Sequence, residues 1–148
     1  MTMLDTHVSL AHGNGGRYMR ELIHEIFARH LANPLLDTES DAAVLPWNAA
    51  DGELVFTTDS FTVQPIEFPG GNIGSLAVHG TLNDLAMVGA RPVCLTVGFV
   101  LAEGLDMALL DRVLASMAAA AAEAGGPVVS GDTKVVERGK ADKLYINT

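Results

Sequence analysis

A carboxylate and an ammonium stand two positions apart in the segment Gly131-Asp132-Thr133-Lys134, directly after the apolar run Pro127 to Val129. Side chains alternate along a strand, so Asp132 and Lys134 would lie on the same face of it. Gly131 would let a ligand approach the backbone closely. This combination suits a phosphate that is bound together with its metal ion. A solvated salt bridge at the end of a strand is the alternative interpretation of the same residues.

Three further aspartates, Asp41, Asp59 and Asp84, are embedded in apolar sequence. Charged residues are seldom buried unless they are paired or bind a metal. Carboxylate oxygens select Mg²⁺, Mn²⁺ or Ca²⁺, whereas zinc sites use cysteine and histidine clusters. Each aspartate could also cap a helix or a turn. Together with Asp132, the set predicts a site for a hard cation such as Mg²⁺, Mn²⁺ or Ca²⁺.

The composition limits the classes of partner. Nine Lys and Arg residues stand against 18 Asp and Glu residues in 148, which gives a formal net charge of -9. This charge makes nucleic acid and anionic membrane poor partners. An acidic protein that binds a nucleoside triphosphate needs cations to offset the repulsion, in agreement with the aspartate set. The length fits one domain that buries roughly 70% of its unfolded surface.

Cysteine usage and hydropathy favour a soluble, cytoplasmic protein. Cys94 is the single cysteine and lies in apolar sequence, so we interpret it as a structural thiol in a reducing compartment. The N-terminal residues lack the basic and apolar regions of a signal peptide. No apolar run in the sequence approaches the length of a membrane span.

Hydrophobic periodicity and turn residues predict the elements of the fold. Helices are expected at residues 18–31, about 73–88 and about 106–124, with Asn72 as an N-cap and glycines as stops. Strands are expected at residues 42–46, 54–61, 92–101, 128–136 and 144–148, the first two forming an antiparallel pair around an Asp51-Gly52 turn. Residues 1–17 are predicted to be a flexible Gly-rich arm, and residues 18–148 to be the folded domain.

This order of elements predicts an α+β fold with a mixed, mostly antiparallel sheet and helices packed on one face. Strands such as residues 95–100 carry apolar side chains on both faces, so the second face needs a cover. A second copy of the chain is the natural cover, and we expect a homodimer.

The Gly-rich segment Gly13-Asn14-Gly15-Gly16 offers main-chain amides that can cradle phosphate oxygens. It lacks the lysine of a Walker motif and does not match a dinucleotide fingerprint. A flexible linker is the alternative interpretation, and the adjacent Arg17 favours the phosphate loop.

These motifs together resemble the N-terminal domain of the HypE family of hydrogenase maturation proteins, within the superfamily of ATP-binding proteins typified by aminoimidazole ribonucleotide synthetase. The resemblance covers essentially the whole sequence. The matching segments are residues 12–17, 41–45, 56–61, 68–74, 80–87, 89–92 and 131–136. The resemblance implies the fold predicted above, a homodimer, and binding of ATP and Mg²⁺.

The resemblance also implies an activity and partners. In the family, the carbamoyltransferase HypF loads a carbamoyl group onto a C-terminal cysteine, and ATP drives its dehydration to a thiocyanate. The cyanide then passes to the HypC/HypD scaffold for the iron of [NiFe] hydrogenase. The implied metal ligands are Asp41, Asp59, Asp84 and Asp132, and the implied nucleotide contacts are Gly13, Asn14, Gly15, Gly16, Asn83, Asp84 and Lys134. Lys134 would contact phosphate or assist proton transfer.

Two departures from the family pattern affect these expectations. Ser40 stands where many relatives carry a second aspartate beside Asp41, so one metal contact is lost or supplied differently. The family's second domain and cysteine-bearing tail are absent from these 148 residues, so we expect this chain alone to be inactive. A non-catalytic dimerisation or docking module, or a related ATP-dependent small-molecule phosphotransferase, remains an alternative.

Overall fold

The computed structural model describes residues 6–36, 38–39, 48, 50 and 52–148. The helices are η1 (Leu10–Gly13), α1 (Arg17–Leu22), the π-helical turn η2 (Ile23–Phe27), α2 (Ala28–Leu31), α3 (Ile73–Met87) and α4 (Met107–Ala124). The strands are β1 (Ser60–Phe61), β2 (Glu67–Phe68), β3 (Gly71–Asn72), β4 (Leu95–Ala102), β5 (Val128–Val136) and β6 (Leu144–Asn147). The three predicted helices are confirmed, the first as the continuous run α1-η2-α2.

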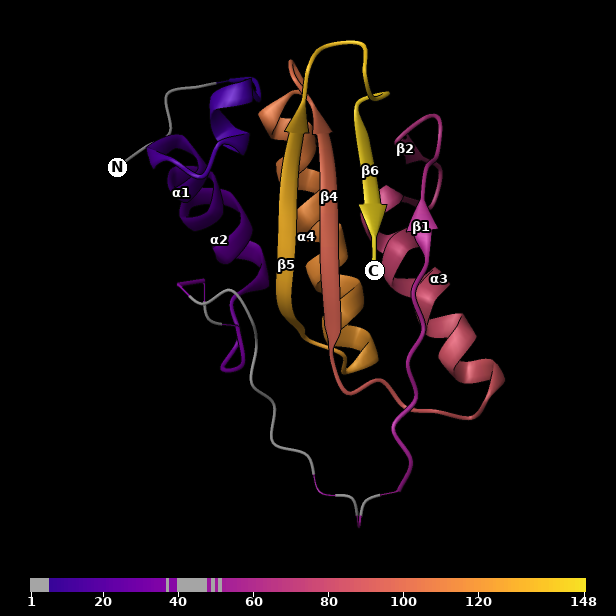
Figure 1. The fold of residues 1–148 in the computed structure, drawn as a ribbon. Coiled ribbons are helices and arrows are strands. Elements are labelled where there is room, and N and C mark those ends of the chain that lie inside the picture. Colours follow the sequence, from indigo (N-terminus) through magenta and orange to yellow (C-terminus); the bar gives the residue numbers. More distant parts are fainter. Residues whose placement is uncertain (1–5, 37, 40–47, 49, 51) are drawn as a thin grey trace.

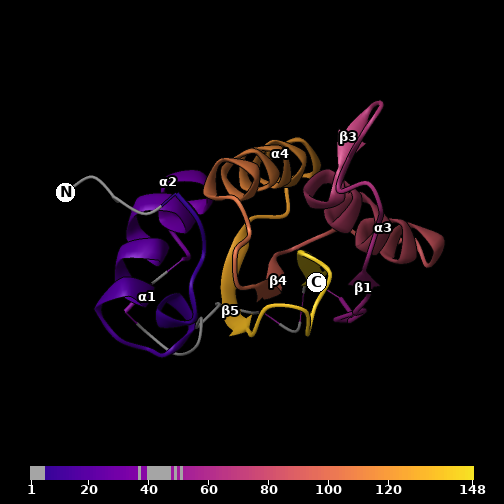
Figure 2. The ribbon, with the colours of Figure 1, turned by 90° about the horizontal axis from the view of Figure 1, so that it is seen from above.

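Four strands form the main sheet in the order β1-β6-β4-β5. Strands β4 and β5 are parallel and joined by α4, whereas β6 pairs antiparallel with both β1 and β4. The mixed, mostly antiparallel sheet is therefore confirmed. Helices α3 and α4 lie over one face of the sheet, while α1 and α2 lie beside the β5 edge (Figures 1 and 2).

The core forms between this sheet face and the helices. Alternate residues of β4 are buried, namely Leu95, Val97, Phe99 and Leu101, and the residues between them face away. Helix α4 completes the layer with the fully buried Leu110, Val113, Leu114 and Met117. Because these positions follow the helical period, burial of one α4 face and of one strand face makes a single core.

Both long helices begin and end as the local sequence predicts. The Asn72 side-chain oxygen accepts from Gly74 N at 2.9 Å, which caps α3. The Asp106 carboxylate caps α4 by accepting from Leu109 N at 2.8 Å, and Gly125 ends α4 with φ of 71°. At Gly74 an added Cβ would lie 2.2 Å from Val113 O, so glycine is what allows α3 and α4 to cross closely.

The structure describes only the second strand of the hairpin predicted for residues 42–46 and 54–61, and this strand is shorter than predicted. Residues 42–46 lie outside the described residues. The prediction of a strand over 54–61 was too long, because only Ser60–Phe61 is a strand. The Phe56 side chain is 83% exposed, so the described part of the chain does not bury it. Strand β4 likewise begins at Leu95, three residues later than predicted.

The N-terminal segment contacts the domain body over its described part. Val8 is buried, and its backbone N–H donates to Leu105 O at 2.8 Å while its carbonyl accepts from Gly104 N at 2.6 Å. His12 is also buried, with its Nδ1 accepting from Ser9 N at 3.1 Å. Val8 is thus held beside the start of α4, whereas the flexible arm that we expected over residues 1–17 stays a prediction.

An ion cluster joins α2 to α4. His30 Nε2 lies 2.7 Å from Asp111 Oδ1, and Arg29 also contacts this carboxylate. The hydrogen bond from His30 lowers the pKa of Asp111, burial opposes this effect, and the charge of Arg29 adds to it. The ionised carboxylate therefore stabilises the fold above the pKa that it has in the unfolded chain, and this stabilisation is lost as the pH falls through its lower, folded pKa.

We expect Asp111→Asn to lower the free energy of unfolding near neutral pH by up to about 1 kcal/mol, as is usual for partly exposed ion pairs. The difference from the wild type should vanish in acid, where the native carboxyl is protonated as well. Urea unfolding between pH 7 and about pH 2 measures this, because the folded pKa lies below the ordinary value of an aspartate. Glu123→Gln on the exposed side of α4 is the matched control, and a difference independent of pH would contradict the assignment.

Candidate functional site

The sheet face opposite α3 and α4 carries two rows of residues across the strands. Register pairs join Asp132 to Gly98, Gly98 to Asn147, and Asn147 to Ser60. A second row joins Lys134 to Val100 and Val100 to Tyr145. The face is polar at β5, β6 and β1, and none of the described helices covers it (Figure 2).

Asp132 and Lys134 point to this open face from β5, as the alternation along the strand predicts. Lys134 Nζ lies 3.3 Å from Asp132 Oδ2, and both side chains are 66% exposed. An exposed pair of this kind contributes little to stability, so both groups can turn towards a ligand at small cost. The ammonium can bind a phosphate oxygen, and the carboxylate can bind a cation.

Gly131 has a different role from the one we expected. An added Cβ there would lie 2.4 Å from Val97 O. The space beside Gly131 is therefore occupied by the backbone of β4, not kept open for a ligand. Glycine at this position allows β4 and β5 to pair closely just before Asp132.

The Gly-rich segment lies against the far end of β5. An added Cβ on Gly13 would lie 2.9 Å from Val135 N, so the two backbones approach closely there. Asn14 Oδ1 accepts from Gly16 N at 3.1 Å, and Gly15 has a φ of 76°. Arg17 Nε bonds to Glu21 at 2.6 Å, and this partner raises the pKa of Arg17. The structure thus places Gly13, the first residue of the Gly-rich segment, next to the strand that carries Lys134.

The other predicted ligands lie at the opposite edge of the sheet. Asp59 precedes β1, and its Oδ1 accepts from Ser60 N at 2.7 Å. Asp84 lies in the last turn of α3, where its Oδ2 accepts from Thr57 Oγ1 at 3.2 Å. Asn83 beside it is exposed. Asp59 and Asp84 therefore share the β1 edge, next to Thr57.

One chain does not assemble the predicted aspartate cluster within its described part. Strands β6 and β4 separate the β1 edge from Asp132, a distance of about 14 Å at the usual strand spacing. Among the described residues, no group of three or more His, Cys, Asp or Glu side chains could hold a metal ion. Asp41 lies outside the described residues, as does Ser40.

Sequence reasoning missed Asn147, which ties β6 to the β1 edge. Its Nδ2 donates to Asp59 O at 2.9 Å and to Ser60 Oγ at 3.0 Å. Asn147 thus fixes the backbone that carries Asp59. The alternation Leu144, Tyr145, Ile146, Asn147 was the signal available, because it places Tyr145 and Asn147 on the face opposite the core.

The environment of Cys94 agrees with the structural thiol expected from the sequence. Cys94 is half-buried, and burial raises the pKa of its thiol, which disfavours the thiolate and agrees with a structural role. Within the described part of the protein, no helix combines the length and apolar character needed to cross a membrane.

The fold and the site define a class of protein. Residues 39–148 match the family model of AIR synthase related protein, N-terminal domain, and the chain belongs to this family. More particularly, the chain is 56% identical over 141 residues to carbamoyl dehydratase HypE of Azotobacter vinelandii. The alignment covers 95% of this chain and 41% of that relative.

Solved structures of HypE proteins also match this chain over most of its length. A crystal structure of hydrogenase maturation protein HypE in complex with ATP matches with a TM-score of 0.89 and 57% identity, over 94% of this chain and 41% of that one. A HypE-HypF complex matches with a TM-score of 0.61 and 47% identity, over 85% of this chain and 40% of that one. The chain thus spans about 41% of the length of its relatives.

Proposed function

We propose that this chain is the ATP-binding N-terminal domain of a HypE-type carbamoyl dehydratase that acts in the cytoplasm. One arrangement carries the proposal: Gly13, at the start of the Gly-rich segment, lies against Val135 of β5, and the open face of this strand presents Asp132 and Lys134. Amides, an ammonium and a carboxylate are the groups that bind a nucleotide's phosphates and its metal ion. The HypE structure solved with ATP supports the choice of nucleotide.

The proposed reaction converts an S-carbamoyl cysteine into a thiocyanate. The carbamoyl oxygen attacks the γ-phosphorus of ATP, and ADP leaves. The carbon–oxygen bond then breaks, phosphate departs, and the nitrogen loses both protons as the carbon–nitrogen triple bond forms. Because negative charge spreads over the transferred phosphoryl group, the Lys134 ammonium would stabilise it by donating hydrogen bonds to its oxygens.

The donor set of this chain suits Mg²⁺ chemically, because Asp59, Asp84 and Asp132 offer only carboxylate oxygens. A bound Mg²⁺ would neutralise charge on the nucleotide's phosphates. The geometry of the described residues in one copy does not bring these carboxylates together. We therefore propose that two copies complete the site, with Asp41 as a further ligand.

A face-to-face dimer satisfies this requirement when its two-fold axis runs along the strands. Such an axis lays the β5 edge of one copy over the β1 edge of the other, with sheets about 10 Å apart. Asp132 and Lys134 of one protomer would then face Asp59, Asn83 and Asp84 of its partner. The open sheet face supports this dimer, because it carries the half-buried Val100 and Tyr145 without a cover from its own described residues.

The proposed partners follow from the relatives. HypF would deliver the carbamoyl group, as the name of the HypE-HypF complex supports. A HypC/HypD scaffold would accept the cyanide. The chain spans about 41% of the length of the Azotobacter vinelandii relative. We propose that the carbamoyl-bearing cysteine is not among these 148 residues.

Calorimetric titration with a non-hydrolysable ATP analogue, with and without Mg²⁺, tests the nucleotide site, while sedimentation reports the oligomeric state. We expect saturable, Mg²⁺-dependent binding at one site per chain by a dimer. A folded dimer that binds no analogue would contradict the proposal for this chain.

Mixing two inactive variants tests the shared site. Asp59→Asn and Asp132→Asn should each abolish binding. When the two are mixed and allowed to exchange subunits, about a quarter of the sites should recover, because half of the dimers are mixed and each holds one intact site. No recovery, despite proven exchange, would mean that each site lies within one copy.

A further inference from the structure

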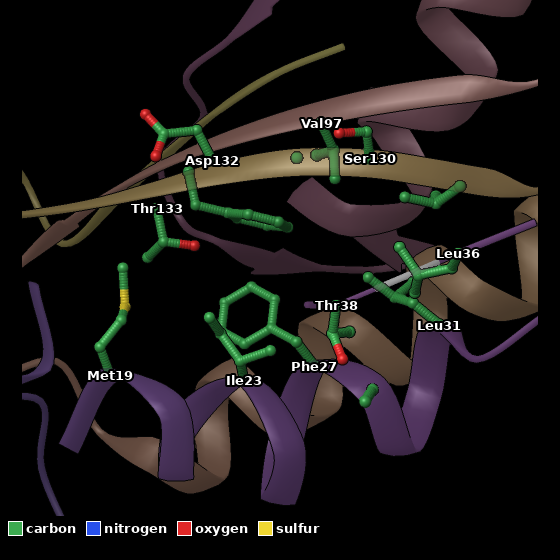
Figure 3. Close-up of a pocket in the computed structure, with 14 residues that line it drawn as sticks. Met19, Ile23, Phe27, Leu31, Leu36, Thr38, Val97, Ser130, Asp132 and Thr133 are labelled. Carbon is green, nitrogen blue, oxygen red and sulfur yellow. The ribbon is translucent and has the colours of Figure 1, made fainter. Parts of the chain in front are cut away.

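Two buried hydroxyl groups meet between α3 and the residue that follows β6. Thr81 of α3 is 2% exposed and Thr148 is 7% exposed, and their Oγ1 atoms are hydrogen-bonded to each other. The third buried threonine among the described residues, Thr133, instead faces a pocket of about 160 Å³ between the first helical run and β5 (Figure 3). Because a buried polar group costs free energy unless it is hydrogen-bonded, the hydroxyl pair Thr81–Thr148 holds its two segments in one arrangement.

The hydrogen bonds of the hydroxyl pair run in one direction. Thr148 Oγ1 donates to the carbonyl oxygen of Ala77 in α3 at 3.3 Å. A hydroxyl carries a single proton, so Thr148 must be the acceptor in its bond with Thr81. Thr81 therefore donates to Thr148, and Thr148 donates to Ala77. Both bonds fix the Thr148 side chain on α3.

The backbone of Thr148 holds the backbone of Asp59. Asp59 N donates to Thr148 O at 2.8 Å, and Thr148 N donates to Asp59 O at 3.0 Å. This pair continues the ladder between β1 and β6 by one residue beyond Ser60 and Asn147. Thr58 Oγ1 also donates to Thr148 O, at 3.0 Å. Thr148 thus joins the chain at Asp59 to α3.

Asp84 belongs to the same helix and lies in its last turn. Its carboxylate accepts from Thr57 Oγ1 at 3.2 Å. On the other side of Asp59, the Phe61 ring packs against α3, since a Cβ added to Gly80 would lie 2.5 Å from Phe61 Cε1. The segments on both sides of Asp59 therefore contact the helix that carries Asp84.

We propose that the hydroxyl pair is a positioning device, which sets the separation of Asp59 and Asp84 so that their two carboxylates bind one cation. The proposal rests on the ATP- and Mg²⁺-binding function above and adds residues that act through the carboxylates. Mg²⁺ demands near-ideal octahedral geometry, so two carboxylates share it only at the right separation. The hydroxyl pair fixes this separation before the cation binds, without contacting the cation.

Thr81→Val tests the proposal, because it removes the donor of the pair and keeps the branched shape of the side chain. We expect the Mg²⁺ concentration that gives half-maximal binding of the ATP analogue to rise about tenfold, as is usual when a residue that orients a metal ligand is lost. At saturating Mg²⁺ the affinity for the analogue should return to that of the wild type. Thr81→Ser keeps the hydroxyl and should restore the wild-type dependence on Mg²⁺. Calorimetric titration at a series of Mg²⁺ concentrations measures these effects.

Ser75→Ala is the matched control, because it removes a hydroxyl from the other end of the same helix. Ser75 Oγ donates to Asn72 O at 3.0 Å, within the cap of α3. We expect this variant to unfold at a lower temperature than the wild type and to keep the wild-type dependence on Mg²⁺. If Thr81→Val behaves in the same way, the hydroxyl pair is only structural and the proposal is overturned, whereas the proposed function stands.

Mn²⁺ tests the shared cation in the wild type, without a mutation. Bound Mn²⁺ is paramagnetic and broadens nearby amide resonances. As Mn²⁺ is added in the presence of the ATP analogue, we expect the amides of Asp59 and Asp84 to broaden with one common midpoint. Different midpoints would mean separate cations and would overturn the proposal. A wild type that binds no analogue at any Mg²⁺ concentration would overturn the proposed function, and the shared cation with it.

Discussion

Replacing Lys134 by alanine is expected to weaken binding of the Mg²⁺-ATP analogue by roughly ten- to a hundred-fold. A hydrogen bond to a charged group contributes about 1.5 to 3 kcal/mol, and each 1.4 kcal/mol is a factor of ten in affinity. Lys134 is 66% exposed and contacts Asp132 at 3.3 Å, so its removal should leave the fold intact. Calorimetric titration measures the affinity, and thermal unfolding checks the fold.

Two further variants make the Lys134 result specific. Lys140→Ala removes an exposed lysine from the turn between β5 and β6, and should leave the affinity unchanged. Lys134→Arg keeps the charge but changes its geometry, and should restore part of the binding. If Lys134→Ala bound the analogue as tightly as Lys140→Ala, Lys134 would have no role at the phosphates.

The second large effect is on stability, at Gly131. We expect Gly131→Ala to lower the free energy of unfolding by about 3 kcal/mol, near the upper end of what overpacking costs. The added Cβ would lie 2.4 Å from Val97 O, which belongs to the backbone of the neighbouring strand. This clash can be relieved only if β4 or β5 moves, because a change of side-chain rotamer cannot displace a backbone carbonyl. Urea unfolding followed by circular dichroism measures the loss.

Gly98→Ala is the matched control, because Gly98 lies in the adjacent strand and in register with Asp132. There an added Cβ would meet Asn147 Cβ at 3.8 Å, an ordinary contact. We therefore expect a small change in stability, within about 0.5 kcal/mol. Equal losses for the two alanine variants would show that close approach to Val97 is not what requires Gly131.

The helices were predictable because their signals are local. Asn72 and Asp106 cap the helices that follow them, and Gly125 ends α4 in the left-handed conformation that glycine tolerates. The pairing of Asp132 with Lys134 on one face was predictable for the same reason, since alternation is a property of the strand itself. These features depend on residues a few positions apart.

The features that sequence reasoning missed depend on distant residues. Leu54 to Phe56 have the composition of a strand, yet the described part of this protein provides no neighbour to bury them. The order of the strands determines that Asp59 and Asp132 stand at opposite edges of one sheet, and the order cannot be read from the residues themselves. The role of Gly131 likewise depends on Val97, which lies 34 positions earlier.

The place of β6 in the sheet has a consequence for biosynthesis. Residues 144–147 form a central strand, which joins β1 on one side to β4 and β5 on the other. A ribosome delivers β6 after every other strand of this sheet. Until then, β1 with α3 and the β4-α4-β5 unit cannot join through their sheet hydrogen bonds, and both would expose unpaired strand edges. Folding of this domain therefore finishes only when β6 leaves the exit tunnel, and a pause in translation before residue 144 would prolong the aggregation-prone state.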